Sequence, residues 1–290
     1  MNIIFGDSFI GPFTLLKDNL LYLKKFKGKT MRGISKINTS DYNLLINIIN
    51  NKKKKIGINY IMFMFGQVDI LFALYYEILI KKNYNIKQYL EETSEKYCKF
   101  LLSIDNIMNY KKIICSICPL MLNDEQTFHS LYLYPIIDID ILKNIPMNLK
   151  NIIFSYEFRN TCRIYLNNLN KIFCNKYNMK YIDFDDILIN KSNNKPFDIL
   201  KVKESDFNIH PYFEIIIKKY LSKLKFMHIK NHFKEDLNNS KNKYIEEKKI
   251  LSNERYNDIK FLEYNNNNID INFNDICIDF NKQISKMKLL

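Results

Sequence analysis

The stretch Asn2-Ile3-Ile4-Phe5-Gly6-Asp7-Ser8 decides the fold prediction. Its mostly apolar first part predicts a buried strand, and the Gly-Asp-Ser that follows predicts a tight turn at the end of that strand. Residues 9–19 then favour a helix, in which Pro12 is tolerated because it lies in the first turn. A buried strand that leads directly into a helix is the first half of a unit that repeats along the chain.

The same alternation continues to about residue 224. Further strands are predicted over residues 21–26, 60–65, 113–118 and 180–184. Helices are predicted over residues 42–49, 70–81, 86–108, 156–177 and 211–224. Alternating strands and helices require right-handed crossovers and a parallel sheet between helix layers. The sequence therefore predicts an α/β fold, a three-layer α/β/α sandwich around a central parallel five-stranded sheet of the flavodoxin-like type.

Several local features accompany these elements. Asp41 is the expected N-cap of the helix over residues 42–49, and the lysines at 52–55 are expected in a loop. Residues 120–151 read as a long connection. One side of the helix over residues 156–177 carries apolar residues at helical spacing, namely Phe158, Cys162, Tyr165, Leu166, Leu169, Ile172 and Phe173.

A change of composition near residue 228 predicts two regions. Residues 1–228 form the α/β domain, whereas residues 229–290 form an extension rich in Lys and Asn. Within it, alternating apolar residues at 269–273 and 276–280 are typical of a strand or hairpin. The extension is either partly disordered or adds an edge element to the domain.

Composition and charge exclude several classes of protein. No apolar run reaches the roughly 20 residues that span a bilayer, and the N-terminus lacks the basic start of a signal peptide. We therefore expect an intracellular, cytoplasmic protein without a membrane span. The net charge of +13 raises the alternative of a nucleic-acid partner, but the lysines are scattered and no nucleic-acid motif accompanies them.

Ser8 is the candidate nucleophile. In an open parallel sheet, ligands bind beyond the carboxyl ends of the strands, and Ser8 follows the first strand. Gly33 and Gly66 follow the second and third predicted strands, so all three residues are expected at one rim of the sheet. Taken alone, each is explained equally well as a turn residue or a helix cap.

Asp206 and His210 precede the last predicted helix, in the stretch Asp206-Phe-Asn-Ile-His210-Pro. A serine hydroxyl becomes a good nucleophile when a histidine accepts its proton and a carboxylate orients the imidazole ring. Asp206 and His210 are close enough in sequence to form such a pair in a turn. The alternative is that His210 only starts the helix and Asp206 only caps a turn.

With these four features the chain resembles the SGNH (GDSL-type) hydrolase family. That family has a Gly-Asp-Ser block with the nucleophile, a second block with an oxyanion Gly, a Gly-x-Asn-Asp block and a final Asp-x-x-His. The matching positions here are Gly6-Asp7-Ser8, Gly33, Gly66-Gln67-Val68-Asp69 and His210. The resemblance covers about 210 residues and implies acyl transfer, with the backbone amides of Ser8 and Gly33 as oxyanion donors.

Two blocks depart from the family pattern. Val68 stands where the family has its oxyanion Asn, and Gln67 is the candidate substitute. Asp206 lies four residues before His210 instead of three, so Glu204 or a backbone carbonyl is an alternative partner for the imidazole. Asp7, Gly66 and Asp69 are expected to brace the loops around the site.

The remaining polar residues yield weaker candidates. Cys115 and Cys118 form a CxxC without a second pair, so core packing is favoured over a zinc site. His228 and His232 have the i, i+4 spacing of metal ligands on a helix but no accompanying Glu. Other candidates are Arg159 and Arg163, as anion-binding or else solvated or capping residues, the acidic stretch 183–186 and His129. Neither a phosphate-binding glycine motif nor a metal set is found, and no cofactor is expected.

The resemblance thus implies a serine-dependent esterase that acts on a small acyl or acetyl ester, of a sugar or of a lipid. A non-catalytic protein with the same fold, which binds a ligand or partner, is the alternative from a different class. A basic nucleic-acid-associated protein is the third.

Overall fold

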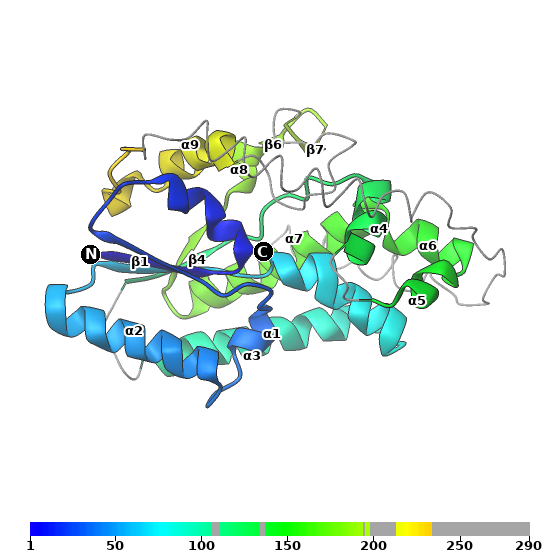
Figure 1. Cartoon of the computed structure of the whole chain (residues 1–290), viewed down its shortest axis with the longest axis horizontal. Coiled ribbons are helices and arrows are strands. Elements are labelled where there is room, and N and C mark those ends of the chain that lie inside the picture. The colour runs from blue at the N-terminus through cyan, green and yellow to red at the C-terminus, as the bar shows by residue number, and fades with distance from the viewer. Residues whose placement is uncertain (106–110, 134–136, 194, 198–212, 234–290) are drawn as a thin grey trace.

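The computed structural model describes residues 1–105, 111–133, 137–193, 195–197 and 213–233 (Figure 1). Its centre is a five-stranded sheet in the order β2-β1-β3-β4-β5, in which every neighbouring pair is parallel. The strands are β1 (Asn2–Gly6), β2 (Leu21–Lys25), β3 (Tyr60–Met64), β4 (Lys111–Cys115) and β5 (Lys180–Ile182). The predicted α/β fold with a central parallel five-stranded sheet is confirmed.

The central strand β1 shows why its sequence is a continuous apolar run. Ile4 lies opposite Leu23 of β2 and Met62 of β3. Ile3, Ile4 and Phe5 are completely buried, so both faces of the strand are covered. A strand covered on both faces needs apolar residues at every position rather than at alternate ones.

Helices cover the two faces of the sheet (Figure 1). One face carries α1 (Met31–Ile34), α2 (Ser40–Ile56), α3 (Ile86–Asp105) and α7 (Tyr156–Lys176). The other carries η1 (Ser8–Leu15), α8 (Asp185–Leu188), α9 (Phe213–Lys223) and η5 (Lys225–Met227). Within this second layer η1 packs against α9, where the rings of Phe13 and Tyr220 stack with centroids 5.5 Å apart.

The helical segment after β3 confirms the prediction over residues 70–81, and it contains two π-helical turns. These are η2 (Asp69–Ala73) and η3 (Tyr76–Ile80). π-helical turns are rare and occur frequently at functional sites. The first of them begins at Asp69, one of the residues predicted to brace the site.

Three predictions about helices are wrong. Residues 120–151 are not a plain connection, because they contain α4 (Asp124–Leu133), α5 (Ile139–Lys143) and α6 (Met147–Ile153). α5 and α6 are too short to show clear apolar periodicity, and α4 carries no clear apolar stripe. The N-cap of α2 is Thr39, whose hydroxyl accepts a hydrogen bond from the Tyr42 N–H at 3.2 Å, and not Asp41. α2 also extends through Lys52–Lys55, whose cations favour the carboxyl end of a helix.

The chain returns to the α/β domain beyond the predicted boundary at residue 228. The Lys17 N–H donates to the His232 carbonyl at 2.7 Å, and Leu16 forms an antiparallel bridge with Phe233. Residues 234–290, with the predicted strand or hairpin, lie outside the described residues. The short antiparallel pair of β6 (Ile189–Asn190) and β7 (Lys195–Pro196) lies near α8. Among the described helices, none combines the length and apolar character needed to cross a bilayer.

Candidate functional site

The strand order places a topological switch point between β1 and β3. From β1 the chain runs to β2 on one side, and from β2 it crosses to β3 on the other. In doubly wound sheets, ligands bind beyond the carboxyl ends of the strands at such a point. Here those ends carry the Gly6-Asp7-Ser8 and Gly66-Gln67-Val68-Asp69 segments. The fold therefore brings the first and third predicted blocks, Gly6–Ser8 and Gly66–Asp69, together at one edge of the sheet. We call it the β1/β3 edge.

Gly6 and Gly66 allow the two segments to approach closely. A Cβ atom on Gly6 would lie 2.5 Å from the Met64 carbonyl oxygen. Gly66 has a φ of +116°, and a Cβ there would lie 2.6 Å from side-chain atoms of Met31 and Ile117. Both glycines are thus required by packing, and Gly66 by its backbone conformation as well.

Ser8 is the first residue of η1 and is half-buried. The preceding Asp7 caps this helix, because its Oδ1 accepts a hydrogen bond from the Phe9 N–H at 2.9 Å. The Asp7 N–H donates to the Met64 carbonyl at 3.2 Å and so ties the turn to β3. Ser8 is therefore held at the switch point by a short, doubly anchored turn.

The Asp7 carboxyl is an acid without a neutralising cation among the described residues. It is 1% exposed, and burial is the main cause that raises its pKa to about 7. The neighbouring Asp69 adds to the rise, whereas the N–H groups of Phe9, Val68 and Gln67 oppose it. Its Oδ2 atom makes no hydrogen bond of standard geometry to a described residue.

Asp69 is the second buried acid at this edge. It is completely buried, and burial likewise raises its pKa to about 7. Its Oδ2 accepts a hydrogen bond from the Met31 N–H at 2.8 Å, which links the block after β3 to α1. Asp69 therefore ties the segment after β3 to α1, and burial places its pKa near neutral pH.

The predicted oxyanion residues have different surroundings. Gly33 does not lie in a loop but in α1, where its N–H donates to the Thr30 hydroxyl at 2.8 Å. This N–H is therefore occupied by a helix cap. Gln67 is 4% exposed and opens the helical segment after β3, next to Asp7. The Ser8 N–H makes no hydrogen bond to another described residue.

Asp206, His210 and the alternative partner Glu204 lie outside the described residues. The nearest described element is α9, which begins at Phe213 and packs against η1. Since η1 begins at Ser8, the chain resumes after His210 on the same side of the sheet as the candidate nucleophile.

Among the buried polar residues of α7, sequence reasoning considered the two arginines but missed Asn167 and Asn170. Asn167 holds Ile117 at the end of β4, accepting from its N–H at 2.8 Å and donating to its carbonyl at 3.1 Å. Arg163 donates to the same carbonyl at 3.0 Å. The signal was a buried polar stripe at helical spacing, formed by Arg159, Arg163, Asn167 and Asn170. The predicted apolar face was partly wrong, because Ile172 is 49% exposed.

Arg159 and Arg163 are not solvated residues. Both are completely buried, and each pairs with an aspartate: Arg159 with Asp124 at 2.9 Å and Arg163 with Asp185 at 2.6 Å. The acidic stretch 183–186 is therefore not simply a solvated loop. These pairs join α7 to the segments that follow β4 and β5.

The metal alternatives find no geometric support in the described residues. His228 ends η5 in a left-handed conformation with a φ of 50°, so the segment to His232 is not helical and the i, i+4 argument fails. Among the described residues, no group of three or more His, Cys, Asp or Glu side chains could hold a metal ion. The five described cysteines are free and buried, as expected for core residues.

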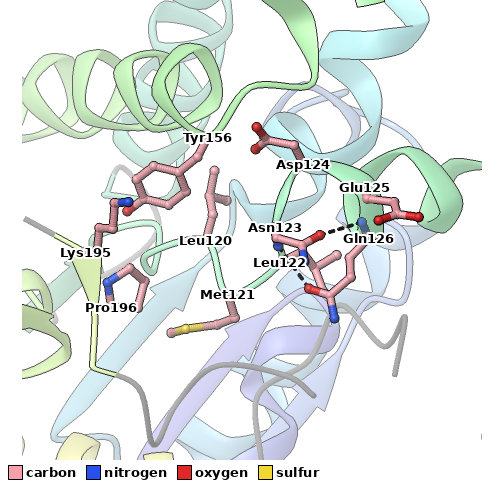
Figure 2. Close-up of a pocket in the computed structure, with 10 residues that line it drawn as sticks. All are labelled: Leu120, Met121, Leu122, Asn123, Asp124, Glu125, Gln126, Tyr156, Lys195 and Pro196. Atoms are coloured by element: carbon pink, nitrogen blue, oxygen red, sulfur yellow. Dashed lines mark hydrogen bonds between the residues drawn. The ribbon is translucent and has the colours of Figure 1, made fainter. Parts of the chain in front are cut away.

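A cavity of about 510 Å³ lies where the chain continues beyond β4 and β5 (Figure 2). We call it the Tyr156 cavity. It is lined by Leu120, Met121, Leu122, Asn123, Asp124, Glu125, Gln126, Tyr156, Lys195 and Pro196. Its volume lies within the range of about 300–1,000 Å³ that is usual for small-molecule sites.

No family model and no curated protein matches this chain. Among solved structures, a GDSL-like lipase from Bacteroides thetaiotaomicron is similar at 11% identity and a TM-score of 0.43, over 78% of this chain and 87% of that one. An acetylxylan esterase from Geobacillus stearothermophilus is similar at 12% identity and a TM-score of 0.42, over 77% and 93%. An α/β hydrolase from the metagenome of Lake Arreo is similar at 12% identity and a TM-score of 0.43, over 77% of this chain and 93% of that one. The solved structures that this chain resembles include hydrolases of the GDSL/SGNH type.

Proposed function

We propose that this chain is a serine-dependent ester hydrolase with Ser8 as nucleophile and His210 as general base. The observation that carries the proposal is the meeting of the Ser8 and Gly66–Asp69 segments at the β1/β3 switch point. A half-buried serine at the start of a helix, beside two buried acids, is typical of an active site and unusual for a plain turn. The return of the chain to η1 through α9, just after His210, supports the choice of base.

In the proposed reaction, His210 accepts the Ser8 hydroxyl proton while Oγ attacks the ester carbonyl carbon. The tetrahedral intermediate collapses, the C–O bond to the alcohol breaks, and His210 returns the proton to the departing alkoxide. Water, deprotonated by His210, then attacks the carbonyl carbon of the acyl-enzyme. The C–Oγ bond breaks, the carboxylic acid leaves, and His210 returns the proton to Ser8 Oγ. Asp206 is the proposed partner that orients the imidazole.

The oxyanion donors of this proposal differ from those implied by the family resemblance. The Ser8 N–H is the leading donor, because it lies at a helix start and is not engaged by a described residue. The Gly33 N–H is already bound by Thr30, and Val68 offers no polar side-chain atom. With fewer donors than the family pattern, we expect a slower enzyme, since one donor is worth about 10²–10³ in rate.

Hydrolysis of p-nitrophenyl acetate and butyrate, together with fluorophosphonate labelling, tests the proposal. Ser8→Ala and His210→Ala should each lower kcat by about 10⁴-fold or more, and Ser8→Ala should abolish labelling. Ser222→Ala on the exposed surface of α9 is the matched control, and it should retain both ester hydrolysis and fluorophosphonate labelling. A folded wild type that neither turns over nor becomes labelled would contradict the proposal.

The second candidate is a non-catalytic protein of the same fold that binds a ligand. Two observations favour it, because both remove an expected oxyanion donor. The Gly33 N–H is bound by the Thr30 hydroxyl at 2.8 Å, and position 68 carries the apolar Val68. Absence of labelling in a folded protein that still binds small ligands would support this candidate.

A further inference from the structure

The Tyr156 cavity has an apolar floor and a polar rim. Leu120, Met121 and Leu122 are 1–6% exposed and form the buried side of its lining. Figure 2 shows Asn123, Asp124 and Glu125 around its other side, with Tyr156 opposite them. Such a lining suits a ligand with one apolar face and several polar groups at its edge.

Tyr156 offers a hydroxyl that lacks a partner. Its oxygen is buried and makes no hydrogen bond to a described residue, although a buried hydroxyl usually has one. Burial raises the pKa of this phenol, so the hydroxyl keeps its proton at neutral pH and can both donate and accept. This oxygen has almost no accessible surface, so a ligand hydroxyl satisfies it, in either direction, after the atoms that cover it shift.

The opposite side of the cavity offers complementary groups. Asp124 is exposed, and its Oδ1 is held by Arg159, which fixes the carboxylate in place. Asn123 uses its Oδ1 to accept from the Gln126 N–H at 2.7 Å, so its amide nitrogen is the atom left to donate. The rim therefore combines a fixed acceptor with a donor, the pattern that adjacent hydroxyls of a polyol bind best.

Contacts through α9 link the segment that lines this cavity to η1, the helix that starts at the candidate nucleophile. The Cys118 thiol contacts the Tyr220 hydroxyl at 2.9 Å, and Tyr220 stacks on Phe13 of η1, the helix that starts at Ser8. From Cys118 the chain continues directly to Leu120 in the cavity wall. Ser8 and the cavity therefore share one edge of the sheet.

We propose that the Tyr156 cavity binds the polyhydroxylated alcohol part of the ester, a sugar or similar polyol, and that the acyl group of the substrate is small. This inference rests on the proposed ester hydrolysis at Ser8. An apolar acyl chain in the cavity would leave the Tyr156 hydroxyl unpaired, and it would cover the exposed Asp124 carboxylate without adding a hydrogen bond to the one from Arg159. A sugar ring places its apolar face on the floor and its hydroxyls at the rim.

Ligand-observed NMR tests binding without any need for turnover. Methyl β-D-glucopyranoside is the probe, and methyl cyclohexyl ether is the comparison, with a similar ring and no ring hydroxyls. We expect the glucoside to bind and Tyr156→Phe to weaken it about fivefold to tenfold, the effect of one lost hydrogen bond. Tyr177→Phe, at the exposed far end of the same helix, should bind like the wild type. Equal binding of the two probes, no glucoside binding, or equal effects of the two variants would overturn the inference.

Kinetics separate this inference from the proposed function. Tyr156→Phe should raise KM for mono-acetates of the glucoside about fivefold to tenfold, whereas Tyr177→Phe should leave both this KM and kcat/KM for p-nitrophenyl acetate within about twofold of wild type. If p-nitrophenyl acetate is hydrolysed but the glucoside does not bind, only the cavity assignment fails. If Ser8 is inert but the glucoside binds at Tyr156, the hydrolase proposal fails and the cavity remains a polyol site.

Discussion

Buried charge is treated differently at the β1/β3 edge and along α7. At the edge, Asp7 and Asp69 are buried and form no ion pair with a described residue, although the charge of Arg32 opposes the rise in the pKa of Asp69. Along α7, Arg159 and Arg163 are completely buried, but each faces an aspartate. Burial raises the pKa of Asp185 too, and the charge and hydrogen bond of Arg163 oppose that rise.

The difference separates a structural region from a candidate reactive one. A buried ion pair with further hydrogen bonds fixes a geometry, and α7 uses its arginines in this way to hold the chain after β4 and β5. Buried acids that form no ion pair destabilise the folded state when they ionise. Such acids with a shifted pKa occur mainly at functional sites. The β1/β3 edge has this second character, which agrees with the proposed role of Ser8.

Removal of an α7 arginine should have the largest effect on stability. Arg163→Met leaves Asp185 unpaired and removes donors to the Ile117 carbonyl and Asn160, so we expect a loss of about 3–5 kcal/mol in the free energy of unfolding. Urea denaturation followed by circular dichroism measures it.

Asp185→Asn is the reciprocal variant. Its loss should be smaller, because Arg163 keeps its other two acceptors, and the double variant gives the coupling between the pair. A loss in the free energy of unfolding below about 1 kcal/mol for Arg163→Met would mean that the buried ion pair adds little to stability. The proposed difference between α7 and the β1/β3 edge would then be wrong.

The pH dependence of stability should come from the β1/β3 edge. Asp7 and Asp69 titrate at about 7 when folded and at about 4 when unfolded, so between these values the folded state holds protons that the unfolded state has released. The contribution of these protonated carboxyls to the free energy of unfolding is complete below pH 4. It is lost as the pH rises to about 7, and the free energy of unfolding then falls by at most about 1.4 kcal/mol per pH unit for each group. Urea denaturation at pH 5, 6, 7 and 8 measures the slope of the free energy of unfolding against pH.

Asp7→Asn should reduce the slope of the free energy of unfolding against pH, because one of the two titrating carboxyls is removed. The helix cap is kept, since the amide oxygen can still accept from the Phe9 N–H. Asp140→Asn, at an exposed position in α5, is the control and should leave the slope unchanged. A slope that is identical in wild type and Asp7→Asn would show that Asp7 is ionised alike in both states.

The sheet could be predicted from the sequence because its signals are local. The runs at 2–5, 60–65 and 113–118 are apolar at every position, and a parallel strand covered on both faces requires that pattern. The three helices that begin within 120–151 could not be predicted, since α5 and α6 last too few turns to establish a period and α4 carries no clear apolar stripe. The N-cap at Thr39 was missed because Asp41 is an equally good cap by residue type.

The candidate site could be predicted only in part. Glycine-rich ends of strands gave the places of Ser8 and Gly66, because backbone geometry there depends on the local residues. The engagement of the Gly33 N–H depends on how Thr30 turns its side chain, and the pairing of Arg163 with Asp185 joins residues distant in sequence. Such contacts follow from tertiary packing, which a single sequence does not display.

The smallest expected effect concerns Thr30, which occupies the Gly33 N–H next to the β1/β3 edge. Thr30→Val removes this cap and should cost about 1 kcal/mol of stability. Because we assign the oxyanion to the Ser8 N–H, kcat for p-nitrophenyl acetate should stay within about twofold of wild type. Thr39→Val removes the equivalent cap of α2 and serves as the control. A rise in kcat for Thr30→Val alone would mean that the freed Gly33 N–H stabilises the oxyanion, and that the edge holds a second donor which Thr30 masks.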